Sequence, residues 1–414
     1  MPSSQPTRFG TILAQRFPAL QHRDFRYLWL GQLISVAGTQ MQNMAINWQI
    51  HQLTPSPVML GLVGLMRVLP IVGFSLIGGM VADAYHRRTI LLITQTVGLL
   101  AACGLAMITA FGADHPSLIF MFTAITAAAG AFDGPARQSL IPNLVPPEHL
   151  NNAVSLNTML FQTAMIAGPA LSGLVIDWGG VEAVYWINAV TFVAVLVALA
   201  VMRFVEVRRE GAPRVSIASL VEGLRFVRSS PLIFSTMILD FFATFFASAT
   251  ALLPIFAADI LKVGAKGMGL LAAADSVGSL VTGFIVSMMG EIRRKGRVLL
   301  VSVALYGIAT ALYGFSTSFV LSLIMLFLVG AGDSVSTILR VTIRQTMTPD
   351  NIRGRTTSIN MIFFLGGPQL GNLEAGLLAT AVGAPLSVAV GGFAVLAVVG
   401  VVAWAFPKLR AYDR

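Results

Sequence analysis

The sequence predicts an all-α integral membrane protein with twelve transmembrane helices. Of its 414 residues, 56% are hydrophobic and only 11% are charged, whereas soluble domains carry about 25% charged residues. A bilayer core about 30 Å thick needs roughly 20 apolar residues per helix. Twelve runs of about this length occur, and they lack the alternating apolar and polar residues of barrel strands. Helices are therefore expected throughout.

The twelve predicted spans are separated mainly by proline, glycine or charged residues. They cover residues 27–53, 58–82, 89–111, 116–141, 151–177, 181–203, 231–260, 265–290, 296–316, 318–346, 355–380 and 384–406. The polar stretch 204–230 divides them six and six. We therefore expect an N-terminal six-helix bundle (1–203), a cytoplasmic linker (204–230) and a C-terminal six-helix bundle (231–414).

The linker contains apolar residues at helical spacing, namely Ile217, Leu220, Leu224 and Val227. This pattern predicts an amphipathic helix at the membrane surface. A solvated linker without a helix is the alternative.

Lysine and arginine indicate the orientation, because cytoplasmic loops collect them. With both termini in the cytoplasm, the opposite side of the membrane holds only Lys262 and Lys266, Arg67 and Arg340 lie within spans, and the other basic residues lie in the tails, the cytoplasmic loops or the span ends next to them. We therefore expect a multi-pass protein of the inner (cytoplasmic) membrane with both termini cytoplasmic. The basic residues that give the chain its net charge of +9 then lie mostly beside the anionic cytoplasmic leaflet. This placement is sufficient to explain the excess of positive charge, so no nucleic-acid partner is expected.

The two halves repeat short motifs at a displacement of about half the chain. Arg137-Gln138 recurs as Arg344-Gln345, Pro147-Glu148 as Pro349-Asp350, and Ser155-Leu156-Asn157 as Ser358-Ile359-Asn360. The paired motifs fall on the same predicted side of the membrane, which indicates parallel repeats. Such repeats place a substrate site between the halves, near the bilayer midplane.

The stretch from Gly79 through Asp83 to Arg87 and Arg88 resembles the signature between the second and third helices of the major facilitator superfamily. Ala84 and His86 depart from the usual arginine and glycine. The resemblance implies a twelve-helix fold of two pseudo-symmetric six-helix bundles. It also implies that Asp83 latches the cytoplasmic side through the positive N-terminal end of helix 11. A plain cluster of charges at a helix end is the alternative.

Gly168, Pro169 and Gly173 in the fifth span resemble the antiporter signature of proton-coupled drug exporters, although Ala164 and Ser172 replace two of its glycines. Close packing of small residues without a coupling role is the alternative. The segments 132–146, 340–355 and 370–376 resemble the enterobactin-exporter-like branch. That branch contains bacterial exporters of siderophores, peptides and drugs.

Charged residues inside the spans are functional candidates, because a charge at the centre of an isolated span costs roughly 2.5–3.5 kcal/mol. Six of them stand out by their position within the spans, namely Arg67, Asp240, Asp275, Asp333, Arg340 and Glu374. Acids outnumber bases, so some acids are expected to be neutral at rest. Asp333 and Arg340 share a helix face and are expected to pair. The other three acids have no base nearby in the sequence.

All four of these acids, Asp275 and Glu374 above Asp240 and Asp333, are candidates for proton coupling. A hydrogen-bonded structural acid is the alternative for each. Asp133 and Arg137 lie one helical turn apart and are expected to form an ion pair near the cytoplasmic end.

Gln40, Asn43 and Asn47 share one face of the first span. This pattern predicts a polar wall of a substrate cavity, to which Arg67 and Arg340 are added as candidates. Hydrogen bonding between helices is the alternative. The first span carries no acid, unlike that of many drug antiporters.

No motif for catalysis, ATP or a metal occurs, the five histidines are scattered, and Cys103 is the only cysteine. No enzyme activity, cofactor or metal site is expected. We expect a monomeric secondary transporter, namely a proton-coupled exporter of an amphipathic organic solute such as a siderophore or drug. Its expected partners are a small-molecule substrate, protons and membrane lipids. The alternative is a flippase or facilitator for a lipid or lysophospholipid without proton coupling.

Overall fold

The computed structural model describes residues 17–203, 217–248, 250–290, 292–349 and 352–413, and in these ranges it contains helices and no strand. The first group of elements is η1 (Pro18–Gln21), α2 (Arg23–Leu53), α3 (Pro57–Ala84), α4 (Arg87–Ala110), α5 (Pro116–Leu144), η2 (Pro147–His149) and α6 (Leu150–Val201).

The second group begins with α7 (Ile217–Ser229), which contains the predicted linker helix. It continues with α8 (Pro231–Phe246), η3 (Thr250–Leu252), α9 (Leu253–Ile255), η4 (Phe256–Ile260), α10 (Gly264–Met288), α11 (Lys295–Gly314), α12 (Phe319–Met347), α13 (Arg353–Val382), α14 (Ala384–Ala405) and α15 (Pro407–Arg410).

The prediction of an all-α membrane protein with twelve spans is confirmed. Nine helical segments within the described residues are long and apolar enough to cross a membrane. One of them is α6, which supplies two predicted spans because Gly180 turns the chain at a φ of 73°, a conformation that glycine adopts without steric cost. The remaining two spans are α2 and α13, whose polar residues lower their hydropathy.

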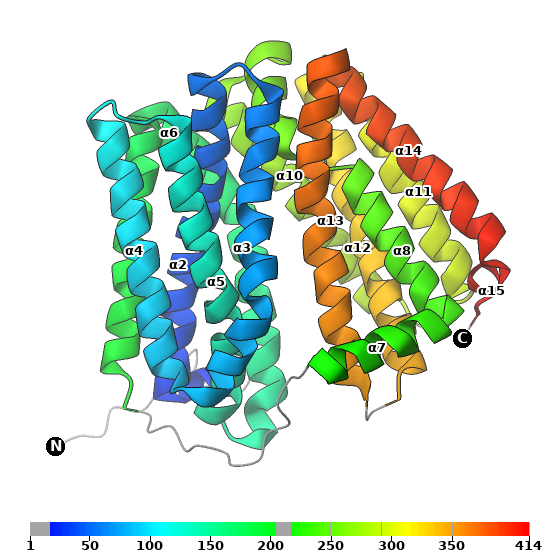
Figure 1. Ribbon diagram of the computed structural model, residues 1–414, viewed down its shortest axis with the longest axis horizontal. Coiled ribbons are helices and arrows are strands. Elements are labelled where there is room, and N and C mark those ends of the chain that lie inside the picture. The colour runs from blue at the N-terminus through cyan, green and yellow to red at the C-terminus, as the bar shows by residue number, and fades with distance from the viewer. Residues whose placement is uncertain (1–16, 204–216, 249, 291, 350–351, 414) are drawn as a thin grey trace, which may run out of the picture.

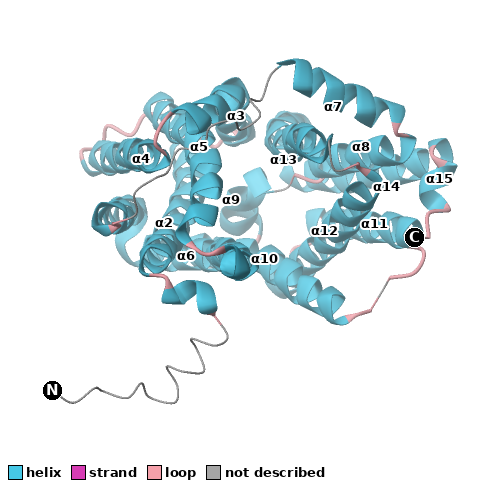
Figure 2. Cartoon of the chain, turned by 90° about the horizontal axis from the view of Figure 1, so that it is seen from below, coloured by secondary structure: helices cyan, strands magenta, loops and turns pink. Residues whose placement is uncertain are grey.

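The helices form two bundles that stand side by side (Figure 1). We call the end of the molecule that carries α7, α15 and the starts of α2 and α11 the terminal end, and the opposite end the far end. Both described chain ends lie at the terminal end. The first bundle contains α2 to α6 and the second contains α8 to α14, with contacts between them where α3 meets α13 and α6 meets α10 (Figure 2).

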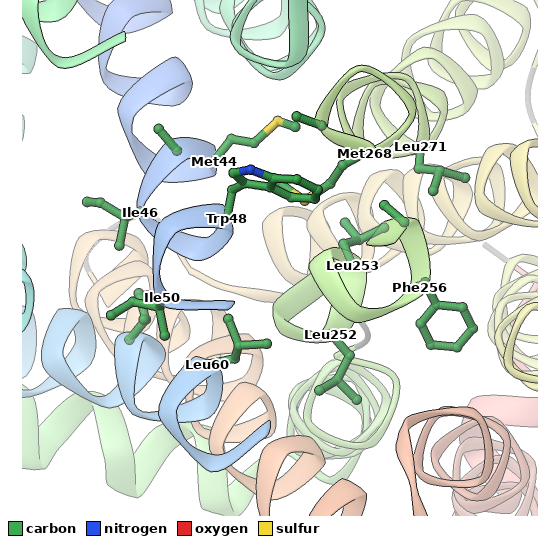
Figure 3. Close-up of a cluster of buried hydrophobic side chains, with 14 of the residues drawn as sticks. Met44, Ile46, Trp48, Ile50, Leu60, Leu252, Leu253, Phe256, Met268 and Leu271 are labelled. Atoms are coloured by element: carbon green, nitrogen blue, oxygen red, sulfur yellow. The ribbon is translucent and has the colours of Figure 1, made fainter. Parts of the chain in front are cut away.

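At the far end the two bundles share one hydrophobic core. Met44, Trp48 and Leu60 of the first bundle belong to the same buried cluster as Leu253 and Met268 of the second (Figure 3). At the terminal end each bundle has a core of its own. One surrounds Phe25 and Leu140, and the other surrounds Leu239 and Leu299.

Glycines bring the bundles into backbone contact in the far half. A Cβ on Gly376 of α13 would lie 2.6 Å from the Pro57 carbonyl oxygen and 3.2 Å from the Gly61 Cα of α3. Only glycine permits this approach without displacement of the partner helix. The predicted domain boundaries at 203 and 231 stay predictions, and residues 204–216 lie outside the described ranges.

Candidate functional site

A cavity of about 520 Å³ lies between the two bundles. Helices α2, α3 and α6 of the first bundle form one wall, and the segment from α8 to α13 of the second bundle forms the other. Its lining combines amide, hydroxyl and charged groups with the methionines Met44, Met165 and Met268. Methionine side chains adapt to ligands of different shape, so the wall suits an amphipathic solute.

Helix α2 contributes Gln40, Asn43 and Asn47 to this wall, the three amides that the sequence places on one face. The Asn43 Nδ2 donates to Gln40 Oε1 over 2.9 Å. The Gln40 amide also contacts the sulfur of Met165 on α6. The Gln40 and Asn43 amides are therefore held by neighbours on the same wall, and the role of all three amides in binding stays a prediction.

Arg67 reaches the cavity from the middle of α3. Its Nη2 donates to the backbone carbonyl oxygen of Asn43 over 3.2 Å. None of the ion pairs within the described residues includes Arg67. A guanidinium carries five N–H donors, so most of its donors are available to a solute.

The opposite wall carries two acids, Asp275 on α10 and Asp333 on α12. The ion pairs of the described residues do not include Asp275, and α12 approaches it so closely that a Cβ on Gly330 would contact its backbone carbonyl. Hydroxyl groups of Ser276 and Tyr306 line the same region. This wall is therefore acidic and rich in donors.

The predicted seventh span, 231–260, is broken where it lines the cavity. Helix α8 ends at Phe246, and the chain continues as short 3-10, α and π turns. Ser248 donates 2.9 Å to the Pro368 carbonyl oxygen and 2.6 Å to Asn372 Oδ1. Broken helices commonly mark binding sites in transporters. The sequence signal was the run of small and polar residues before Pro254, which cannot donate a backbone hydrogen bond.

Asp240 has no base nearby in the sequence, but the structure supplies one from another helix. Arg340 Nη2 lies 2.8 Å from Asp240 Oδ1 and 3.7 Å from Asp333 Oδ1. Arg340 also donates to the hydroxyls of Ser336 and Thr337 over 2.7 and 2.8 Å. The pairing joins α8 to α12, and spacing along one helix cannot reveal a partner on another. Arg340, a predicted cavity residue, is buried behind the lining.

Glu374 is half-buried on α13 and lies outside the lining of the central cavity, although its neighbour Asn372 belongs to it. The Asp333–Arg340 contact predicted from the sequence is present at 3.7 Å, longer than the Asp240 contact.

A second pocket of about 440 Å³ lies inside the first bundle, among α2, α4, α5 and α6. Its lining includes Asp133 and Arg137, which form the predicted ion pair. Asp133 also accepts hydrogen bonds from Gln95 and Thr94 over 2.6 and 3.2 Å. The pair is thus a buried and hydrogen-bonded element of the first bundle. Gln40, common to both linings, lies between this pocket and the central cavity.

A comparison with protein families decides which kind of protein carries this cavity. The model of the transmembrane secretion effector family matches residues 14–414. The chain belongs to this family of major facilitator superfamily transporters.

Curated relatives of this transporter include exporters. It is 27% identical over 393 residues to the enterobactin exporter EntS of Shigella boydii, covering 92% of this chain and 91% of the relative. It is also 27% identical over 398 residues to the multidrug efflux pump Tap of Mycolicibacterium fortuitum, covering 92% and 95%.

Solved structures share the fold. A bacterial homologue of the human lysosomal transporter Spinster, in an inward-facing and unoccupied conformation, superimposes with a TM-score of 0.72 at 14% identity, covering 94% of this chain and 96% of that one. A POT family transporter in complex with 5-aminolevulinic acid gives 0.73 at 12% identity, with the same coverage. These structures show the shared fold, and the family match together with the curated relatives identifies the chain as a multi-pass membrane transporter.

The antiporter-like motif of the transporter packs helices closely. A Cβ on Gly168 would lie 2.5 Å from Gln40 Cβ on α2, and one on Gly173 would lie 2.6 Å from the Ala265 carbonyl oxygen on α10. Pro169, between them, lines the cavity. The motif thus sits at both a packing interface within the first bundle and the contact between the bundles.

The gating motif is described only in part. Helix α3 includes Gly79 and Asp83, but their side chains lie outside the described residues, so the latch stays a prediction. Arg87 begins α4, and Arg88 Nη2 donates to the Ala200 carbonyl oxygen at the end of α6 over 3.0 Å. Arg88 therefore binds the negative end of a helix within its own bundle.

Sequence reasoning missed several lining residues of the second bundle, among them Ser276, Tyr306, Tyr313 and Asn372. The Tyr313 hydroxyl is buried and makes no hydrogen bond within the described part of the chain. Only Asn372 carried a signal, since it lies in the segment 370–376 that resembles the exporter branch.

Proposed function

We propose that this transporter is a proton-coupled exporter of an amphipathic organic solute, such as a siderophore or drug, in a bacterial inner membrane. The central cavity is the proposed substrate site, opened alternately to each side by rocking of the two bundles. The names of the relatives EntS and Tap support export of such solutes. A cavity lined by amides, hydroxyls and methionines supports an amphipathic substrate.

The observation that carries proton coupling is the position of Asp275. Its carboxyl group belongs to the cavity lining and has no basic partner within the described residues. Such a group can take up a proton on one side and release it on the other as access alternates. Asp333 is the second candidate in the lining. Asp240 is engaged with Arg340, and Glu374 lies outside the lining, so both rank lower.

Transport by proteoliposomes with a pH gradient tests this proposal, with enterobactin and ethidium as probe solutes. We expect Asp275→Asn to abolish uphill transport while downhill exchange continues, because an amide mimics the protonated acid. Asp177→Asn, which alters an exposed acid of α6 just before its turn at Gly180, at the far end of the molecule, is the matched control and should transport as the wild type does. Wild-type transport that moves no protons would refute the coupling.

The alternative, a lipid or lysophospholipid flippase, is separated by the same vesicles. If a fluorescent lysophosphatidylcholine crosses the membrane without a pH gradient and neither enterobactin nor ethidium is transported, lipid transport replaces the export proposal.

We also propose that the terminal end faces the cytoplasm. Lys262 and Lys266 lie at the far end, whereas most of the other basic residues that the structure describes lie at the terminal end, and cytoplasmic loops collect lysine and arginine. In a Cys103→Ala background, Ala113→Cys should react with an impermeant maleimide on intact cells and Glu148→Cys only after lysis. The reverse pattern would overturn this orientation.

A further inference from the structure

The central cavity is polarised, with its positive charge on one bundle and its negative charge on the other. We propose that it selects zwitterionic solutes, whose acidic group binds on α3 and whose basic group binds on α10. This inference rests on the proposed function only in taking the cavity as the substrate site. It narrows the amphipathic substrate to one charge pattern.

The positive wall depends on Arg67. It is the one lysine or arginine among the described lining residues, and within the described part of the chain it donates a hydrogen bond to the Asn43 carbonyl oxygen. The planar guanidinium binds a carboxylate through two parallel hydrogen bonds. Asn43 and Asn47 line the same cavity and supply amide groups that can orient such a carboxylate.

The wall formed by the second bundle is called the negative wall. Among the described residues it still carries acidic charge without a basic partner after the ion pairs within this bundle are taken into account. Arg340 neutralises one of its two acidic neighbours, and Asp240 is the closer at 2.8 Å. Asp333, 3.7 Å from Arg340, has a side chain that is 43% exposed. Asp275 has no basic partner at all within the described ranges. This wall therefore attracts an ammonium group and repels a carboxylate.

A solute with a single charge satisfies one wall and leaves the other without a partner. Between apolar helices an unpaired charge is unfavourable. A solute that brings its charge next to a wall of the same sign is also repelled, so it binds less tightly. A zwitterion meets both walls at once. When its ammonium group pairs with Asp275, a proton held by that carboxyl leaves to the cavity water, so solute and proton compete for one group.

Because Arg67 and Asp275 belong to different bundles, a zwitterion also links the walls. A ligand shifts a conformational equilibrium toward the arrangement that it contacts best. A bridging solute therefore favours the arrangement in which the walls approach, whereas a solute bound to one wall has no such effect.

Four forms of one fluorescent scaffold test the proposal on purified full-length protein in nanodiscs. The probes are ciprofloxacin, which is zwitterionic, its methyl ester, which keeps the amine, its N-acetyl derivative, which keeps the carboxylate, and the doubly blocked compound. Fluorescence anisotropy gives the four Kd values. We expect ciprofloxacin to bind about ten- to a hundred-fold more tightly than either singly blocked form, since each blocked group removes a charge-assisted contact.

Two variants assign each preference to a wall. Arg67→Gln should lose the preference for a free carboxylate and keep that for a free amine, and Asp275→Asn should do the opposite. Arg67→Lys keeps the charge but loses the planar fork, so it should retain part of the carboxylate preference. The exposed acid variant Asp177→Asn should bind all four forms as the wild type does. A melting curve confirms that each variant is folded.

Equal binding of the four forms, tightest binding by a singly charged form, or no binding of ciprofloxacin would each overturn the zwitterion proposal. The export proposal survives these outcomes if enterobactin or ethidium is still transported against its gradient. It fails separately if the wild-type protein moves none of enterobactin, ethidium and ciprofloxacin.

Discussion

The far end and the terminal end of the molecule hold together in different ways. At the far end one buried cluster includes residues of both bundles, and glycines on α3, α6, α10 and α13 let backbones touch. At the terminal end the buried clusters belong to one bundle each, and the buried ion pairs, Asp133–Arg137 and Asp240–Arg340, lie within a bundle. The structure therefore joins the bundles at the far end.

This difference indicates how access to the cavity alternates. Each bundle keeps its own core and its own ion pair at the terminal end, so it can rotate as a unit without losing them. What must break is the shared apolar contact at the far end, which is non-directional and can be remade. Charge substitutions should therefore destabilise a bundle, and steric substitutions at the far end should shift the equilibrium between states.

The largest effect is expected from Asp133→Asn. It leaves Arg137 buried without its partner, and removal of one member of a buried pair costs about 3–5 kcal/mol. The melting temperature of the purified protein should fall steeply. The double variant Asp133→Asn with Arg137→Gln removes both charges and should recover much of the loss.

Spin-label distances across the far end distinguish this effect from a change of state. Labels at Ala113→Cys and Thr317→Cys, which are exposed residues of opposite bundles, should report an unchanged distance in Asp133→Asn. A changed distance with an unchanged melting temperature would contradict the separation of bundle stability from the far-end contact.

The next effect is expected from Gly269→Ala at the α6–α10 contact. The added Cβ would lie 2.6 Å from the Pro169 carbonyl oxygen and 3.2 Å from the Gly173 Cα. Overpacking costs about 1–3 kcal/mol, and here it is relieved when the far end opens. The population opened at the far end should rise about 5- to 150-fold.

The spin labels at positions 113 and 317 measure this shift, because opening at the far end adds a longer distance to the distribution between them. Gly400→Ala on α14, where a Cβ would meet nothing within 4 Å, is the matched control and should leave the distances as they are. A lower melting temperature with unchanged distances would mean that the glycine serves stability alone.

The sequence predicts the fold well because membrane spans are set by local composition. The turn at Gly180 and helix α7 follow directly from glycine, charge and periodicity. The break after Phe246 was missed because its cause is tertiary, since Ser248 bonds to Pro368 and Asn372 of α13. The run of small and polar residues before Pro254 is the signal that the sequence carries, but the broken geometry depends on a neighbouring helix.

The candidate site was predictable where one helix carries the pattern. Gln40, Asn43 and Asn47 lie on one face because of helical spacing, and Asp133 pairs with Arg137 one turn away. The partner of Asp240 could not be read from spacing, because Arg340 is 100 residues away and reaches it through the packing of α8 against α12. Which acids line the cavity likewise depends on how helices rotate in the bundle.

The smallest effect is expected at the terminal end, where α7 is attached to the second bundle. Glu222 Oε2 lies 2.6 Å from Arg355 Nη1, with side chains 55% and 39% exposed, and Val227 of α7 packs with Ile233 and Ile359. Exposed ion pairs contribute about 0.2–1 kcal/mol and weaken with salt, so Glu222→Gln should speed amide exchange in α7 by no more than about fivefold. At 1 M salt the difference from the wild type should vanish.

Val227→Ala, which removes buried apolar contact, should speed amide exchange in α7 more than Glu222→Gln does, and by the same factor at low salt and at 1 M salt. If Glu222→Gln instead lengthened the far-end distance between labels 113 and 317, the terminal end would control the contact between the bundles, and the contrast between the two ends would have to be abandoned.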